Sequence, residues 1–166
     1  MAEINYVVRD LKLSHEGVFD LKELYKLMKG WFNLHKFDFY EKEYFDVLKT
    51  DAKDIKLKWE VERKIDDYTK FVIETDIKIN DHRIVEVKKG DKKAKLSSGG
   101  LIIKFTSYLR QDYQEKWEGP VKKFVRGLYD KFIYKERYER YEEEIKEETY
   151  NIFNEVKAYL NLQKFE

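Results

Sequence analysis

The sequence of residues 55–79 is IKLKWEVERKIDDYTKFVIETDIKI, and its pattern decides the fold class. Apolar and charged side chains alternate from Ile55 to Val61, and the alternation returns from Phe71 to Ile79. A period of two is typical of a strand with one buried face. Asp66-Asp67 lies between the two runs, where aspartate favours a turn. The stretch therefore predicts an antiparallel hairpin with one apolar face.

The sequence before this hairpin predicts a strand and a helix. Residues 4–13 alternate as a strand does, and residues 21–32 carry apolar side chains at helical spacing. Asp20 and Glu23 have the spacing of a capping box at the start of this helix. Residues 37–48 are rich in aromatic side chains and are ambiguous between strand and helix.

The sequence after the hairpin predicts further antiparallel strands. They cover residues 83–88, 94–97 and 101–110. Asn80-Asp81 predicts a turn before the first of them, and Gly90-Asp91 predicts a hairpin tip. Ser98-Gly99-Gly100 predicts a break before the last.

The last quarter of the chain predicts one long helix over residues 120–162. Pro120 follows Gly119, and proline is well suited to the first position of a helix. Gly127 is a possible point of bending. We expect one stripe of this helix to lie on the inner face of the sheet. It consists of Val121, Val125, Leu128, Phe132, Tyr138, Tyr141, Ile145, Ile152, Val156 and Tyr159.

These elements predict a single α+β domain over residues 1–166, with an antiparallel sheet of about six to seven strands. One N-terminal helix and the long C-terminal helix pack on the sheet. The order of elements resembles the helix-grip fold of the START and polyketide-cyclase-like superfamily, although that family usually has two helices after its first strand. The resemblance implies that the sheet is curved around the last helix. It also implies an apolar cavity between the two that holds a lipid, hormone or polyketide.

We therefore expect binding of a small apolar or amphipathic molecule between the sheet and the C-terminal helix. Tyrosine suits such a site because its ring is apolar and its hydroxyl orients one hydrogen bond. The alternative is that the tyrosines are core-edge residues whose hydroxyls reach water. The residues expected to line the cavity are Trp59, Phe71, Ile73, Phe105, Tyr134, Tyr138, Tyr141 and Ile145.

Arg63 is the polar residue that breaks the apolar alternation of the first hairpin strand. It is a candidate anchor for a ligand carboxylate. It is equally suited to an ion pair with a glutamate of the last helix. A position at the solvated end of the strand is the third possibility, and it is the one we favour.

Charge is unevenly distributed along the C-terminal helix. Residues 121–140 carry seven basic and three acidic side chains, whereas residues 141–166 carry three basic and seven acidic ones. Two such helices packed antiparallel would set each basic half against an acidic half. A homodimer, or docking of another partner on this helix, is therefore an alternative function. A solvated helix with internal ion pairs also fits the pattern.

The composition excludes several classes of protein. The chain has 166 residues, no cysteine and a formal net charge of +1, which argues against disulfides, zinc–thiolate sites and nucleic-acid binding through bulk charge. No stretch approaches the ~20 apolar residues of a membrane span. The N-terminus has no secretory pattern, so we expect a cytoplasmic protein.

A lysine cluster surrounds the predicted hairpin tip of residues 88–95. Lysines at such a tip protect an exposed sheet edge from aggregation. Contact with RNA is a weaker alternative, so nucleic acid is an unlikely partner. The lysines concerned are Lys88, Lys89, Lys92, Lys93 and Lys95.

The sequence carries no catalytic or metal-binding pattern. His15, His35 and His82 lie in unrelated segments, and we expect each at the surface or its boundary. The SSGG of residues 97–100 lacks the ending and the following helix of a phosphate-binding loop. We expect no cofactor, no metal and no enzymatic activity.

Overall fold

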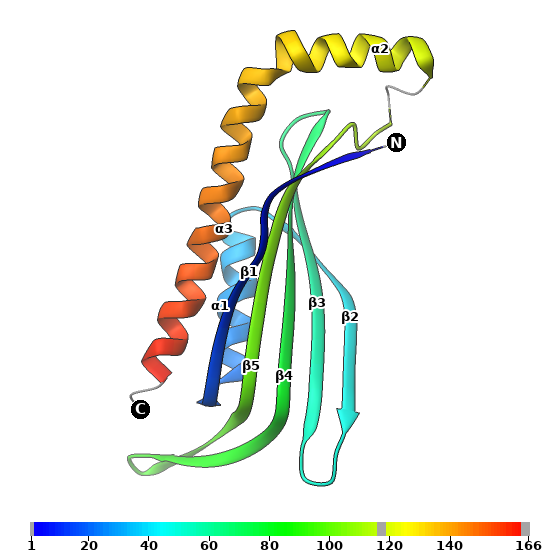
Figure 1. The fold of residues 1–166 in the computed structure, drawn as a ribbon. Coiled ribbons are helices and arrows are strands. Elements are labelled where there is room, and N and C mark those ends of the chain that lie inside the picture. Colours follow the sequence, from blue (N-terminus) through cyan, green and yellow to red (C-terminus); the bar gives the residue numbers. More distant parts are fainter. Residues whose placement is uncertain (1, 116–118, 164–166) are drawn as a thin grey trace.

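The computed structural model describes residues 2–115 and 119–163. Within these residues the chain forms an α+β fold whose five strands make one antiparallel sheet, in the order β1-β5-β4-β3-β2 (Figure 1). In chain order the elements are β1 (Glu3–Phe19), α1 (Leu21–Leu34), β2 (Asp38–Leu48), β3 (Lys53–Lys64), β4 (Thr69–Lys89), β5 (Lys92–Gln111), α2 (Pro120–Tyr129), the π-helical segment η1 (Asp130–Tyr134) and α3 (Lys135–Gln163).

Helices α1 and α3 pack on the same face of the sheet, and α3 lies along β1 and β5 (Figure 1). The core forms between them because the apolar sides of β1, β3, β4 and β5 face the helices. The side chains of Leu24 and Met28 from α1 and of Ile145 and Ile152 from α3 join the inward-facing residues of the sheet in one cluster. The alternation from Ile55 to Val61 behaves as predicted, since every apolar residue of this run is buried.

The sheet has five strands where the sequence predicted six to seven, because two predicted interruptions lie inside continuous strands. β4 passes through Asn80-Asp81 and β5 passes through residues 98–100. The pairing of β4 with β5 shifts between Asn80 and Arg83, and Asp81 adopts a φ of 53° there. An extra residue in one strand bends the strand without ending its ladder. The turn signals of the sequence thus mark a bulge.

Gly99 is the residue of β5 that permits this bulge. Its φ is +156°, and a Cβ atom added to it would lie 2.6 Å from the backbone oxygen of Asn80. Beyond the bulge, residues 83–89 and 92–98 form the β4–β5 arm, which ends at the predicted hairpin tip. The arm curves across beneath α1 and the end of β1 (Figure 1).

α1 begins where the sequence predicted, and half of the predicted capping box forms. The Glu23 backbone N–H donates to Asp20 Oδ1 at 3.1 Å. The Glu23 side chain pairs with Lys26 instead of returning to the Asp20 backbone. The apolar stripe of α1, at Leu24, Met28, Trp31 and Phe32, is buried.

The helical region predicted over residues 120–162 is divided by η1 into α2 and α3. The chain changes direction at η1, so α2 lies across the end of the sheet while α3 runs along its length (Figure 1). α2 continues through Gly127 without interruption. A π-helical turn holds one extra residue and rotates the following face by roughly 100°. The first part of the predicted stripe is therefore not on the sheet. Val121, Val125, Leu128 and Phe132 are exposed.

Among the described residues, the helices do not include one with both the length and the apolar character needed to cross a bilayer.

Candidate ligand-binding groove

The residues predicted to line a cavity lie together on the inner face of the sheet and on its covering helix. Most of them belong to the packed core, and Tyr138 and Tyr141 are partly buried against it. Tyr134 is also buried. The fully buried core members are Trp59, Phe71, Ile73, Phe105 and Ile145.

The tyrosine hydroxyls of the C-terminal helix bind the turn between β3 and β4. Tyr141 donates to Asp66 Oδ2 at 3.2 Å, and the Tyr134 hydroxyl is hydrogen-bonded to Thr69 Oγ1. Oδ1 of the same Asp66 accepts the backbone N–H groups of Tyr68 and Thr69, at 2.8 and 2.7 Å. Burial raises the pKa of the Tyr134 hydroxyl above its ordinary value. These tyrosines connect the helix to the predicted Asp66-Asp67 turn.

Arg63 forms the second connection between sheet and helix. Its Nη1 donates to the backbone oxygen of His35 at 2.8 Å, and its Nη2 donates to Glu148 Oε1 at 3.0 Å. Glu144 accepts from the same nitrogen at 3.2 Å. Burial raises the pKa of Glu148, and the Arg63 charge opposes that rise. Of the three positions considered for Arg63, the structure has the ion pair with the last helix; its side chain is only 16% exposed.

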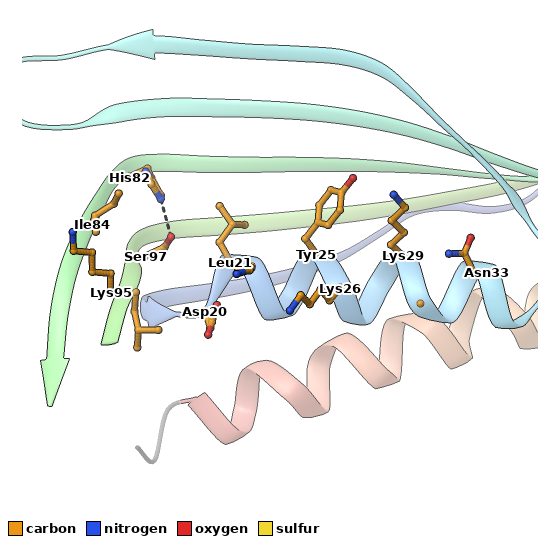
Figure 2. Close-up of a pocket in the computed structure, with 13 residues that line it drawn as sticks. Asp20, Leu21, Tyr25, Lys26, Lys29, Asn33, His82, Ile84, Lys95 and Ser97 are labelled. Carbon is orange, nitrogen blue, oxygen red and sulfur yellow. Dashed lines mark hydrogen bonds between the residues drawn. The ribbon is translucent and has the colours of Figure 1, made fainter. Parts of the chain in front are cut away.

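A large open groove lies on the other side of α1, against the β4–β5 arm. Its volume is about 850 Å³, and most of its surface is apolar. Figure 2 shows Leu21, Tyr25 and Lys29 projecting from α1 toward the strands, with Ile84 and Lys95 on the arm. The lining consists of Asp20, Leu21, Lys22, Tyr25, Lys26, Lys29, Gly30, Asn33, His82, Ile84, Lys95, Leu96 and Ser97.

The apolar wall of the groove comes from both elements. Leu21 and Tyr25 are one helical turn apart on α1, and both are partly buried. The Tyr25 ring packs edge-on against Trp59 at 5.2 Å between ring centres, which fixes its position. On the arm, Leu96 is buried whereas Ile84 is 68% exposed. An exposed isoleucine in the wall of an open groove leaves apolar surface for a ligand to cover.

His82 and Ser97 form a buried polar pair in the groove. His82 Nε2 lies 2.8 Å from Ser97 Oγ, and both residues are buried (Figure 2). Burial lowers the pKa of His82, and the nearby charge of Lys53 lowers it further. The imidazole is therefore neutral at neutral pH and adds no charge to the groove. The sequence predicted each histidine at the surface or its boundary; His15 and His82 are buried instead, and His35 is partly buried.

The rim of the groove is cationic. The groove is lined by four lysines and by one acidic residue, Asp20. Lys29 Nζ lies 5.6 Å from the centre of the Phe39 ring and 5.8 Å from that of Tyr25, so its charge sits above apolar rings. Lys26 is paired with Glu23 at 3.4 Å. The lysines of the rim are Lys22, Lys26, Lys29 and Lys95.

Among the lysines of the predicted cluster whose side chains the structure describes, Lys95 lines this groove. Lys88, Lys92 and Lys93 are exposed near the hairpin tip, and Lys88 lies opposite Lys93 in the ladder. The side chain of Lys89 lies outside the described part of the structure.

The predicted cavity residues do not include those of the groove. The signal in the sequence is the i, i+4 pair of Leu21 and Tyr25 beside lysines at 22, 26 and 29. Such a row is ordinary on a half-exposed helix. The arm residues that complete the groove come near α1 only because β4 and β5 bend at the bulge.

Residues 2–115 and 119–163 contain no group of three or more His, Asp or Glu side chains arranged to hold a metal ion. Comparison of the chain with protein-family models, curated proteins and solved structures finds no match.

Proposed function

We propose that this protein binds a small amphipathic molecule with an anionic head group in the groove between α1 and the β4–β5 arm. The proposal rests on one observation, an apolar groove of about 850 Å³ with a cationic rim. Small-molecule sites occupy roughly 300–1,000 Å³ and combine apolar walls with a few polar groups. An apolar tail would cover Leu21, Tyr25 and Ile84, while a carboxylate would lie among the rim lysines.

This proposal retains the helix-grip-like arrangement, with a ligand between a curved sheet and a helix. The site lies against α1, whereas the sequence predicted one against the C-terminal helix. The tight packing of Phe71, Phe105 and Ile145 in the core supports the change of position. The binding role is proposed without catalysis, for a protein of the cytoplasm.

The homodimer through the C-terminal helix stays a prediction, and so does RNA binding at the hairpin tip. The change of direction at η1 falls inside the basic half, residues 121–140, so the two charged halves do not form one straight helix. A straight antiparallel pair of the two halves would require that bend to open. Binding in the groove requires no such rearrangement of the chain.

The proposal is tested by titrating the protein calorimetrically with three amphiphiles of one chain length, below their micelle concentrations. We expect dodecanoate to bind and dodecanol to bind more weakly, because only the former uses the lysines. Dodecyltrimethylammonium should bind least. Added salt should weaken the binding of dodecanoate more than that of dodecanol. Equal binding of all three amphiphiles would contradict a role for the cationic rim.

Two matched pairs of variants locate the binding. Lys95→Glu reverses a rim charge, and Lys92→Glu makes the same change at an exposed position near the hairpin tip. Ile84→Glu places a charge in the apolar wall of the groove. Leu34→Glu introduces the same charge at an exposed apolar position that does not line the groove. The groove variants should lose dodecanoate binding while their controls retain it. Equal losses in both members of a pair would contradict the site.

A further inference from the structure

α2 and the start of η1 carry an apolar stripe that no described part of the chain covers. Its members are Val121, Phe124, Val125, Leu128 and Phe132, with exposed fractions of 76%, 69%, 43%, 45% and 71%. Successive members are three, one, three and four residues apart, and this spacing places them on one face of a helix. A contiguous exposed apolar patch of this kind marks an interaction surface.

The opposite face of α2 is fixed to the body of the protein through Arg126. Its Nε donates to the Tyr68 hydroxyl at 2.9 Å, and its guanidinium is paired with Glu3. Asp130 and the buried Asp112 lie within 3.6 and 3.7 Å of its nitrogens. The Arg126 side chain is only 14% exposed. The helix is therefore held with its stripe turned outward, at the end of the molecule (Figure 1).

The charges beside the stripe identify what it fits. Lys122, Lys123 and Lys131 are exposed, whereas the one acidic residue of this segment, Asp130, is engaged by Arg126 and Tyr68. An amphipathic helix with phenylalanines on one face and lysines beside it is typical of helices that lie in the interface of a membrane. Anionic head groups attract such lysines.

A second copy of this chain fits the stripe less well. Residues 120–134 carry four basic side chains and one acidic side chain, so packing two copies of this segment together would bring like charges close. Juxtaposed like charges oppose association.

We propose that α2 binds the surface of an anionic lipid bilayer, with Phe124 and Phe132 inserted below the head groups and the lysines in contact with them. The body of the protein then lies on the bilayer through one end of the sheet. This inference is independent of the groove, which is lined by α1 and the β4–β5 arm.

The test is flotation of the full chain with vesicles of phosphatidylcholine alone and of phosphatidylcholine mixed with phosphatidylserine. We expect binding to the mixed vesicles, little binding to the neutral ones, and release by salt. Phe124→Ser with Phe132→Ser should reduce binding by about tenfold or more, because two exposed rings lose their apolar insertion. Leu34→Ser, an equally exposed apolar position on α1, should leave binding unchanged.

Four results would count against the proposal. The first is no binding to the mixed vesicles, and the second is binding that the double serine variant retains in full. The third is a two-chain mass in sedimentation equilibrium that falls to one chain in that variant, because the stripe would then be a self-association surface. Both rings are exposed, so the variant should keep the wild-type circular dichroism spectrum. Loss of vesicle binding by Lys95→Glu, a groove variant, would also count against an independent surface.

Discussion

Arg63 on β3 donates from Nη2 to Glu148 Oε1 on α3 at 3.0 Å, across the junction of sheet and helix. Its Nη1 also holds the backbone oxygen of His35, just after α1, at 2.8 Å. One guanidinium thus joins β3, the end of α1 and α3. Its charge lies over the rings of Phe37 and Phe71, at 4.7 and 5.1 Å from the ring centres. Arg63 therefore fixes the angle at which α3 lies on the sheet.

Arg63→Met should destabilise the protein by about 3 kcal/mol, because it leaves the largely buried Glu148 carboxylate without its partner. The free energy of unfolding is measured by urea denaturation followed by circular dichroism. Lys64→Met is the matched control, since Lys64 is 57% exposed and pairs with Asp67 at the surface. An ion pair this exposed adds little to stability, so that change should cost much less than Arg63→Met. Equal losses in the two variants would show that Arg63 does not hold the helix.

Tyr141→Phe should cost about 1 kcal/mol, because it removes the hydrogen bond to Asp66 Oδ2 and leaves the ring in place. Tyr150→Phe on the same helix, where the side chain is 42% exposed, serves as the control and should change little. The melting temperatures of both variants are compared with that of the wild type. A Tyr141 variant as stable as the wild type would mean that the ring alone supports the turn.

Gly99→Ala and Gly127→Ala should change stability in opposite directions. At Gly99 the new methyl group would meet the Asn80 backbone oxygen, so we expect a loss of about 1–3 kcal/mol. At Gly127, an exposed position inside α2, nothing lies within 4 Å of the new methyl group. Alanine has the higher helix propensity, so we expect a gain of up to about 1 kcal/mol. Urea denaturation measures both, and a neutral Gly99→Ala would contradict the bulge described for β4 and β5.

His82 should make the stability of the protein fall in mildly acidic solution. Burial depresses its folded-state pKa below the ordinary 6.5. Between these two pKa values the unfolded chain binds the proton and the folded chain does not. The contribution of His82 to stability is therefore fully present above pH 6.5 and is lost as the pH falls from 6.5 through the lower folded-state pKa. His82→Gln removes the titration, so the difference in unfolding free energy between wild type and variant should shift across this window. A difference that does not change with pH would contradict the prediction.

The sequence predicted those parts of the fold that depend on a local period. Alternation in the 55–79 hairpin and helical spacing after Asp20 led to the correct elements, because each pattern reflects one buried face. The turn and the break predicted at residues 80–81 and 98–100 were wrong, because Asn, Asp and Gly occur in bulges as well as in turns. The residue types at 130–134 did not predict the π-helical segment there. A bend there moved four predicted core residues to the surface.

The candidate site was less predictable than the fold. Arg63 stood out because it interrupts an apolar alternation, and its partners on α3 were among the options considered. The groove depends on Tyr25 and Ile84 lying close together, and no local sequence pattern predicts that proximity. It arises from the bend of two strands toward a helix that precedes them by about fifty residues. Only the assembled chain brings the apolar wall and the rim lysines together.

Backbone amide chemical shifts, followed by solution NMR as dodecanoate is added, decide whether the groove is the binding site. We predict that the shifts concentrate in residues 20–33 of α1 and at His82, Ile84 and Leu96, and that Lys95→Glu abolishes them. Shifts centred on Phe105, Tyr138 and Tyr141 would instead place the ligand between the sheet and α3, and would contradict the groove. The absence of any shift at saturating dodecanoate would contradict binding of an anionic amphiphile altogether.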